Sequence, residues 1–533
     1  MSRNSRRISL FDTTLRDGQQ TRGVDFTLKD KHAIATKLDA LGLDYIEGGW
    51  PGANATDEQF FANPPKLHKS RFVSFGMTRR PGRSSANDPV LAGLRDAQCD
   101  ASCIVGKTWD FHVTHALGTT LDENRAMIRE SLHSLGQDNR EMLFDAEHFF
   151  DGYKHNPDYA LHCLEEALKG GANWVVLCDT NGGCLPEEVY EITLKAATVV
   201  PGEKLGIHTH NDTGNAVANT LAALEAGARQ IQGTLNGLGE RCGNANLITL
   251  IPTLKLKSDY NIGISDEGLA QLTEVSRWLD EILGRTPNPH APYVGESAFA
   301  HKAGLHASGV AKAPECYEHI TPDLVGNKRL IVMSDQSGRA NVQLMLDQAG
   351  LNYQIDADTA RKIIERIKEM EQTGLTFDGA DASFELFLLE FLNKRPEYFQ
   401  LDRFRVIDER RWNARNEIIV ESVALIDLEI KGRKFTEAAT GTGPVSALDK
   451  ALRKTLSSYS ELEDMRLTDY KVRILDSKNG TDAVTRVIIE NQDSQNRIWR
   501  TVGVSSNIID ASFMALNDAI SWKLYHENVT PHL

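Results

Sequence analysis

Eight short apolar runs, rich in β-branched and aromatic residues, recur along the first half of the chain. The runs are Ile8–Asp12, Leu43–Glu47, Arg71–Gly76, Cys99–Val105, Glu141–Ala146, Trp174–Asp179, Lys204–His208 and Arg229–Thr234. The longer stretches between them, such as Thr27–Leu41 and Pro157–Lys169, place apolar residues at i, i+3, i+4 and i+7, as amphipathic helices do. This alternation predicts an α/β fold, a (β/α)₈ TIM barrel of about 250 residues. An open doubly wound sheet is the alternative, but no Gly-x-Gly-x-x-Gly follows the first run.

Reactive side chains follow the predicted strands at their carboxyl ends, which is where the active sites of such barrels lie. They are Arg16 and Asp17 after the first strand, Glu47 closing the second, Glu147 after the fifth, Thr180 after the sixth, His208 and His210 ending the seventh, and Asn244 in the loop after the eighth. Loops after strands are polar in any barrel, so ordinary solvated side chains are the alternative. Polar residues without a shared role would be scattered over both ends, so the pattern favours one site.

His208-Thr209-His210 places two imidazoles two residues apart on an extended segment, so both point to the same face. With the Asp17 carboxylate they predict a divalent metal site, and Asn244 is a weaker amide-oxygen candidate. The set suits Mn²⁺, Mg²⁺, Co²⁺ or an expanded Zn²⁺ site, with open positions for a chelating 2-oxo acid. The metal would act as a Lewis acid and a template. Alternatively, one histidine packs and the other is hydrated.

Four further residues have both a catalytic and an ordinary interpretation. Arg16 can stabilise an alkoxide or enolate beside the metal, or it can form a surface ion pair. Glu47 can hold Arg16 in place, or it can be a hydrated carboxylate. Thr180 can donate its hydroxyl to a substrate carboxylate, or it can cap a helix. Glu147 can be a general base, directly or through water, or it can be solvated.

The loop Gly237–Asn244 contains three glycines and could suggest a phosphate-binding loop. It lacks the Gly-Lys-[Ser/Thr] ending of a P-loop. Tight backbone packing around the metal end of the barrel explains these glycines better.

The composition indicates a globular, acidic protein. Its net charge is −15, which argues against non-specific binding to nucleic acid or to an anionic membrane. No window approaches the ~20 apolar residues of a transmembrane helix, and the basic start has no apolar stretch behind it suited to a signal peptide. Seven scattered cysteines without a Cys-x-x-Cys pair indicate reduced thiols, so we expect a cytoplasmic protein.

A chain of 533 residues is expected to form several domains. We predict the barrel at 1–265, helical lid or linker subdomains at 266–397, and an α+β domain at 398–533. In the last part, strands lead into a helix at Pro444–Leu456, and the same order recurs before a helix at Ile508–Leu524. The small residues at both helix entries can seat a carboxylate, or they can be ordinary caps.

Long motifs spread over nearly the whole chain resemble those of a known family. They are Asp12-Thr-Thr-Leu-Arg-Asp-Gly18 with Gln20, Ile46-Glu-Gly-Gly-Trp-Pro-Gly52, Phe75-Gly-Met-Thr-Arg-Arg80, His208-Thr-His-Asn-Asp212, Asn236-Gly-Leu-Gly-Glu-Arg-Cys-Gly-Asn-Ala245 and Ala298-Phe-Ala-His-Lys-Ala-Gly-Leu-His-Ala-Ser308. The family is that of the metal-dependent, Claisen-condensing barrel synthases, which contains α-isopropylmalate, homocitrate and citramalate synthases. The hydroxymethylglutaryl-CoA lyases are its cousins. The second, third and last motifs look most like the citramalate synthase branch.

This resemblance implies an acyltransferase that condenses acetyl-CoA with pyruvate to give (R)-citramalate and CoA, the first step of a threonine-independent route to isoleucine. It also implies a homodimer whose C-terminal domain senses an end product, with isoleucine as the inhibitor. The runner-up in the same chemistry is α-isopropylmalate synthase, which uses 2-oxoisovalerate. A different class of protein, a non-catalytic amino-acid-responsive regulator, would have no need for the intact metal ligands.

The resemblance also assigns residue roles. Asp17, His208 and His210 would bind the metal, with Asn244 near or in its shell. Arg16 would bind the keto-acid oxygen with support from Glu47. Gln20 and Thr180 would contact substrate, and Glu147 would serve in deprotonation. His301 would complete the base machinery from beyond the barrel. Some relatives carry an aromatic residue at the position of Asp145, so the resemblance gives Asp145 no secure role.

Overall fold

The computed structural model describes residues 7–138, 140–302, 304–331, 342–343, 346, 355–412, 414–475 and 483–531. The chain divides into two compact units. One contains Met1–Phe299 and Ile320–Lys328, and the other contains Ala300–His319 and Arg329–Leu533. Each unit has its own large hydrophobic core.

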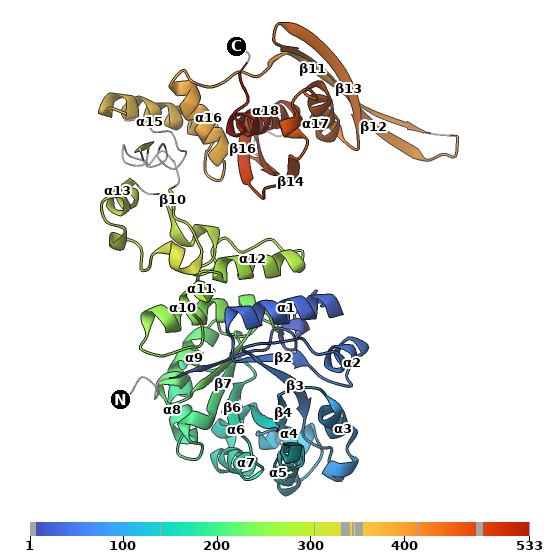
Figure 1. Cartoon of the computed structure of the whole chain (residues 1–533), viewed down its shortest axis with the longest axis vertical. Helices are drawn as coiled ribbons and strands as arrows, with labels where there is room; N and C mark the ends of the chain where they lie inside the picture. The colour runs from blue at the N-terminus through green and yellow to red at the C-terminus, as the bar shows by residue number, and fades with distance from the viewer. Residues whose placement is uncertain are drawn as a thin grey trace. The chain divides into compact units, whose positions relative to one another are not determined.

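Eight parallel strands close into a barrel in the first unit (Figure 1). They follow one another in chain order, and β1 closes the ring by pairing with β8. The strands are β1 (Ser9–Asp12), β2 (Tyr45–Gly49), β3 (Arg71–Met77), β4 (Ala101–Lys107), β5 (Glu141–Glu147), β6 (Trp174–Asp179), β7 (Leu205–Thr209) and β8 (Gln230–Gly233). The predicted barrel is confirmed, and every predicted strand end lies within two residues of the observed one.

Successive strand residues face opposite sides, which gives the barrel two apolar layers. Phe11, Tyr45 and Leu143 belong to a cluster inside the barrel, where the rings of Phe11 and Tyr45 stack at 5.7 Å. Their chain neighbours Leu10 and Ile46 pack in the larger core between strands and helices. Apolar packing thus fills the barrel interior, and the polar site residues follow at the carboxyl ends of the strands.

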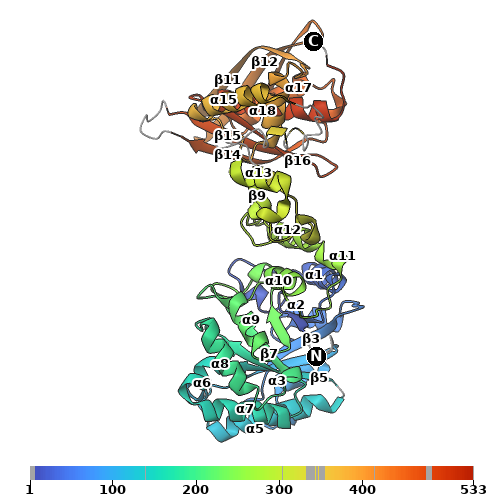
Figure 2. The ribbon, with the colours of Figure 1, turned by 90° about the vertical axis from the view of Figure 1, so that its left-hand side faces the viewer.

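Helices cover the outside of the barrel (Figures 1 and 2). The helices of this unit are α1 (Leu28–Leu41), α2 (Ala55–Ala62), α3 (Pro89–Asp96), α4 (Asp110–His115), α5 (Leu121–Leu135), α6 (Phe149–His155), α7 (Pro157–Lys169), α8 (Pro186–Ala196), α9 (Ala216–Glu225), α10 (Leu247–Lys257), α11 (Asp266–Leu269) and α12 (Leu272–Ile282). The first of them starts at a capping box formed by Thr27 and Asp30 and stops at Gly42, whose φ is 100°. Sequence-encoded caps therefore fix both ends of the helix that follows β1.

The second unit begins with small elements. They are β9 (Ala300–His301), α13 (Gly304–Lys312), β10 (Leu330–Ile331), α15 (Ala357–Gln372) and α16 (Asp381–Phe391). The helices agree with the predicted helical character of this part. β9 and β10 form a two-stranded parallel sheet, which the sequence analysis does not predict.

Three antiparallel strands followed by a helix occur twice in the rest of this unit. The first set is β11 (Gln400–Trp412), β12 (Ile418–Ile430), β13 (Arg433–Gly441) and α17 (Pro444–Thr455), and the second is β14 (Arg466–Ile474), β15 (Thr485–Gln492), β16 (Ile498–Ser505) and α18 (Ile508–His526). Each helix packs on the last two strands of its set. The predicted duplication is confirmed, although the sequence analysis does not single out β11. No helix in the described ranges is long and apolar enough to cross a membrane.

Candidate metal centre

Three predicted metal ligands meet at the carboxyl ends of the barrel strands. Asp17 lies in the turn between β1 and the 3-10 helix η2 (Gly18–Gln20), His208 lies in β7, and His210 follows it directly. Their ligand atoms lie within 4.8 Å of one another, and all three residues are buried. The two Nε2 atoms are 3.2 Å apart and lie 3.5 and 3.9 Å from Asp17 Oδ2. Two nitrogens and one oxygen therefore converge as a divalent cation requires.

Gln232 in β8 determines which nitrogen of His208 faces this centre. Its Oε1 accepts a hydrogen bond from His208 Nδ1 at 2.9 Å, and its Nε2 donates to Asp145 Oδ1 at 3.0 Å. Because an amide oxygen can only accept, Nδ1 carries the proton and Nε2 keeps its lone pair. A hydrogen bond of this kind behind a histidine ligand fixes the tautomer that binds metal.

Arg16 is held beside the centre by two carboxylates and an aromatic ring. Its Nε donates to Glu47 Oε2 at 2.7 Å and its Nη1 donates to Asp17 Oδ2 at 3.0 Å. The guanidinium lies 3.9 Å from the ring centre of Phe75. Glu47 is fully buried and also accepts from Thr13 Oγ1 at 2.5 Å. The hydrated alternative for Glu47 and the surface ion pair for Arg16 are therefore wrong.

Burial and neighbouring charges set the protonation of the three ligands. Burial, and next the charge of His208, lower the pKa of His210 to about 4, and burial also lowers the pKa of His208. Burial raises the pKa of Asp17, but Arg16 and the two imidazoles outweigh it and bring this pKa to about 2. At neutral pH the centre offers two neutral imidazoles and one carboxylate, which are the forms that bind a metal.

Asn244 reaches the same centre from the loop after β8. Its Nδ2 donates to Asp17 Oδ1 at 3.1 Å and to the Leu238 carbonyl at 3.0 Å. Among the described residues, its buried Oδ1 and the buried Nδ1 of His210 have no hydrogen-bond partner. A buried polar atom without a partner costs about 1–3 kcal/mol, and at this centre the free Oδ1 of Asn244 is available to a bound cation.

Gly239 and Gly243 let the loop close around Asn244. Their φ angles are 153° and 89°, a region that favours glycine. A Cβ on Gly239 would lie 2.1 Å from Asn244 Nδ2, and one on Gly243 would lie 1.9 Å from the Gly237 carbonyl oxygen. Close packing therefore explains the glycines, as the sequence analysis favours.

A buried lysine joins the turn after β1 to β2. Lys31 in α1 is fully buried, and its Nζ donates to the carbonyls of Leu15 at 3.0 Å and Gly48 at 2.9 Å. Asp57 in α2 accepts from the same Nζ and balances its charge. Because Arg16 and its carboxylate partner are the chain neighbours of these two carbonyls, the lysine fixes the relative position of both.

Three other predicted residues lie at or near the carboxyl ends of their strands. Glu147 is the last residue of β5 and forms an ion pair with Lys107. Thr180 follows β6, and its Oγ1 accepts from the His148 backbone N–H at 2.9 Å, so its own proton can be donated elsewhere. Gln20 is exposed at the end of η2.

His301 lies in β9 of the second unit. Its Nε2 is 3.3 Å from Glu318 Oε1, and Glu318 also accepts two hydrogen bonds from Arg329, at 2.5 and 2.7 Å. These contacts order the imidazole within its own unit. Its role beside the barrel stays a prediction.

Several groups that build the centre are given no role by the sequence analysis. Thr13, Lys31, Phe75 and Gln232 act through contacts between distant segments. Two of them do break a local pattern: Lys31 occupies a buried position of its helix, and Gln232 is a buried polar residue in a strand. A polar residue in an otherwise apolar position is the one sequence signal that could have found them.

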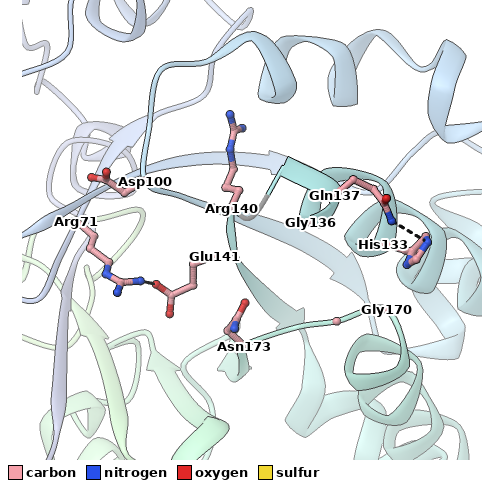
Figure 3. A pocket seen from close by; sticks show the side chains of 10 residues that line it. Arg71, Asp100, His133, Gly136, Gln137, Arg140, Glu141, Gly170 and Asn173 are labelled. Carbon is pink, nitrogen blue, oxygen red and sulfur yellow. Dashed lines mark hydrogen bonds and ion pairs between the residues drawn. The ribbon is translucent and has the colours of Figure 1, made fainter.

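A polar cleft of about 630 Å³ lies at the amino-terminal ends of the strands (Figure 3). Arg71, Asp100, Glu141 and Asn173 line it, each at or just before the start of a strand. Arg71 pairs with Glu141, which also accepts from the Tyr45 hydroxyl at 2.8 Å. No buried side-chain polar atom of its described lining residues lacks a partner. The paired groups of this cleft therefore indicate a structural role and not a ligand site.

Family comparisons agree with the fold and the metal centre. Residues 7–277 match the family described as HMGL-like, whose members are metal-dependent barrel enzymes. Residues 293–374 match the homocitrate synthase post-HMGL domain-like family, and 378–524 match the LeuA allosteric (dimerisation) domain. These matches define a condensing barrel enzyme with an appended LeuA-type domain.

Full-length relatives narrow the class. The chain is 49 % identical over 97 % of its length to an (R)-citramalate synthase of Aquifex aeolicus, of which 98 % is covered. It is 47 % identical over 97 % of its length to one of Synechocystis, of which 96 % is covered. A probable 2-isopropylmalate synthase of Methanopyrus kandleri is 31 % identical over 96 % of this chain and 97 % of that protein. The chain belongs to the citramalate synthase branch of the HMGL-like family, a group of condensing acyltransferases.

Proposed function

We propose that this chain condenses acetyl-CoA with pyruvate and water to give (R)-citramalate and CoA. The observation that carries the proposal is the convergence of Asp17, His208 and His210 beside an arginine that is paired with two carboxylates. The names of the relatives at 47–49 % identity support this choice of substrates.

The metal would be held by Asp17, His208 and His210, and Asn244 could add its unpartnered amide oxygen. The residues fit a divalent cation because their ligand atoms are buried, close together and in metal-binding protonation states. The bound cation would supply Lewis-acid polarisation of a 2-oxo acid and a template for its chelating oxygens.

Arg16 binds the ketone oxygen of pyruvate and stabilises the alkoxide that forms on it. Glu47 and Asp17 bind two edges of its guanidinium, which leaves the remaining N–H groups for the substrate. The guanidinium keeps its positive charge throughout the reaction. Thr180 donates its hydroxyl proton to the substrate carboxylate, and Gln20 contributes at the open side.

A base removes a proton from the acetyl methyl group, the resulting carbanion attacks the ketone carbon, and water then cleaves the thioester and releases CoA. Glu147, held by Lys107, is the base candidate of the barrel, and His301 is the candidate of the second unit. We propose both residues as bases. The variants Glu147→Gln and His301→Gln should each lower kcat more than they change KM for pyruvate.

The decisive experiment measures CoA thiol release with acetyl-CoA and each of three acceptors, namely pyruvate, 2-oxoisovalerate and 2-oxobutyrate. Pyruvate should give the largest kcat/KM, and the product should be the (R) enantiomer of citramalate. Preference for 2-oxoisovalerate would identify an isopropylmalate synthase instead. Thiol release with none of the three would contradict the condensing activity altogether.

The C-terminal domain, predicted at 398–533, is proposed to bind isoleucine and to join two chains into a homodimer. The match of residues 378–524 to the LeuA allosteric (dimerisation) domain supports an allosteric and a dimerising role, and isoleucine is the effector that the family resemblance implies. Full-length protein should be used, because α16 shares a hydrophobic core with α18 and a truncation would expose it. Isoleucine should inhibit thiol release and bind one site per chain by calorimetry, and leucine and valine serve as controls. Inhibition equal for all three would contradict the assignment of the inhibitor.

A further inference from the structure

A cleft of about 570 Å³ in the second unit carries a surplus of positive charge. Its charged lining residues are Lys302, Lys471, Arg473 and Arg486 against Glu371 and Asp378. Leu375, Val472 and Ile488 add an apolar part. The whole chain has a net charge of −15, so the sign of the cleft is opposite to that of the protein.

The surplus resides on two arginines that face each other. Arg473 in β14 lies directly opposite Arg486 in the neighbouring antiparallel strand β15. Side chains in this relation share one face of the sheet, with Cβ atoms about 5 Å apart, and like charges there are destabilising. Burial, and next the charge of Arg473, lower the pKa of Arg486. The carboxylates of Glu371 and Asp378 in the same cleft raise this pKa to a smaller extent, and the cleft keeps more positive than negative charge.

The hydrogen-bond acceptor that holds Arg486 in this cleft is neutral. Arg486 Nε donates to the Gly374 carbonyl at 2.7 Å, which holds the guanidinium in place without neutralising it. In the described parts of the chain, neither arginine forms an ion pair with a carboxylate. Lys302 and Lys471 differ, because they pair with Asp378 at 2.9 Å and with Asp469 at 2.6 Å.

We propose that this cleft binds a phosphate-bearing organic anion, with Arg473 and Arg486 on the phosphate. Guanidinium groups match phosphate oxygens with paired hydrogen bonds, and one phosphate can bridge two of them. The volume is that of a small-molecule site and exceeds what a single phosphate fills, and the apolar side chains can contact the organic part. An adenine nucleotide has both components. The site is independent of the proposed condensation.

The test is calorimetry on the full-length chain with AMP and, separately, with inorganic phosphate. AMP should bind saturably, at one site per chain, and at least tenfold more tightly than phosphate. Arg473→Gln and Arg486→Gln should each weaken AMP binding at least tenfold. Arg403→Gln is the matched control, because Arg403 in β11 of the same unit pairs with Asp427 at 2.5 Å and lies outside the cleft lining. It should leave AMP affinity unchanged.

Stability separates a binding site from an ordinary basic surface. Without ligand, Arg473→Gln should unfold at the same or a higher temperature, because it relieves the repulsion between the two guanidiniums. AMP should then raise the unfolding temperature of the unaltered chain but not of this variant. Absence of saturable AMP binding, or equal binding by Arg473→Gln, would overturn the proposal. Equal affinity for phosphate and AMP would show that the cleft does not bind the organic group of the anion.

Discussion

The two ends of the barrel differ in how their polar groups are satisfied. At the amino-terminal end, Arg71 and Glu141 pair with each other and with neighbouring residues, and the described lining leaves no buried side-chain polar atom without a partner. At the carboxyl end, buried atoms of Glu47, His210 and Asn244 have no partner. At the amino-terminal end, Gln230 at the start of β8 also has unpartnered amide atoms, but only the carboxyl end combines such atoms with three converging metal-binding groups in the described residues.

This difference shows why cavity size is a weak guide to function. A missing partner costs a buried polar atom about 1–3 kcal/mol, and at the carboxyl end such atoms lie beside three converging metal-binding groups. At the carboxyl end, ion pairs such as Arg16 with Glu47 lie beside unpartnered buried atoms, whereas the described lining of the amino-terminal cleft has no such atom. His210 at the carboxyl end and Arg71 at the amino-terminal end are the residues whose replacement tests this difference directly.

Replacing His210 with Ala should have the largest effect, because it removes a ligand of the proposed metal. Turnover should fall by about 10³-fold or more, equivalent to roughly 4 kcal/mol of transition-state stabilisation. Calorimetric titration with Mn²⁺ or Zn²⁺ should show weaker binding, and circular dichroism should show an intact fold. His133→Ala, at the amino-terminal cleft, is the matched control and should keep both properties. Normal turnover of His210→Ala after removal of metal would contradict the assignment.

Lys31→Met should destabilise the barrel by about 3–5 kcal/mol, since it leaves the Asp57 charge buried without its partner. The midpoint of urea unfolding measures this. The double variant Lys31→Met with Asp57→Asn should recover part of the stability, because it removes the stranded charge.

Activity of the double variant tells whether the lysine only stabilises the fold. The carbonyls of Leu15 and Gly48 lose the lysine in both variants, so Arg16 and its partner are no longer tied together. We expect kcat to stay low in the double variant while KM for pyruvate changes little. Recovery of kcat together with stability would show that Lys31 has no positioning role.

The metal-free protein should lose stability on the acid side of neutrality. The pKa of His210 is about 4 in the folded chain, and an unfolded histidine has a pKa of about 6.5. The unfolded state therefore binds a proton that the folded state does not, and the free energy of unfolding falls as the pH drops from 6.5 to 4, by up to about 3 kcal/mol. Urea unfolding at several pH values measures this slope. His210→Ala should flatten it, whereas an unchanged slope would show that the stability loss arises elsewhere.

Gln232→Leu should weaken metal binding by about 10–100-fold, because the proton of His208 Nδ1 then has no fixed acceptor. Competition with a chelator measures the affinity directly, without reference to activity. Gln232→Glu keeps an acceptor at the same place and should retain most of the affinity. If both variants bind metal as the unaltered chain does, Gln232 does not set the tautomer.

The sequence predicts the barrel, its candidate ligands and Glu47 beside Arg16, but not the supports that Gln232 and Lys31 provide. Strand and helix periods mark the eight units, and each ligand is attached to a strand end, so Asp17, His208 and His210 can be placed without coordinates. Gln232 and Lys31 act across segments that are distant in sequence. Their hydrogen bonds depend on which strands and helices become neighbours. The hydrophobic period of a single helix or strand does not indicate its neighbours.

Arg71→Gln should have the smallest effect, because its ion pair with Glu141 is at the amino-terminal end and the arginine side chain is 56 % exposed. An exposed pair contributes about 0–1 kcal/mol, so the urea midpoint should shift only slightly. Glu141 keeps the Tyr45 hydroxyl as a donor, which limits the loss further. Metal affinity and kcat should equal those of the unaltered chain, since no predicted ligand contacts this cleft. A fall in kcat without loss of stability would mean that the two ends are coupled through the barrel interior, and the contrast between a structural end and a reactive end would then fail.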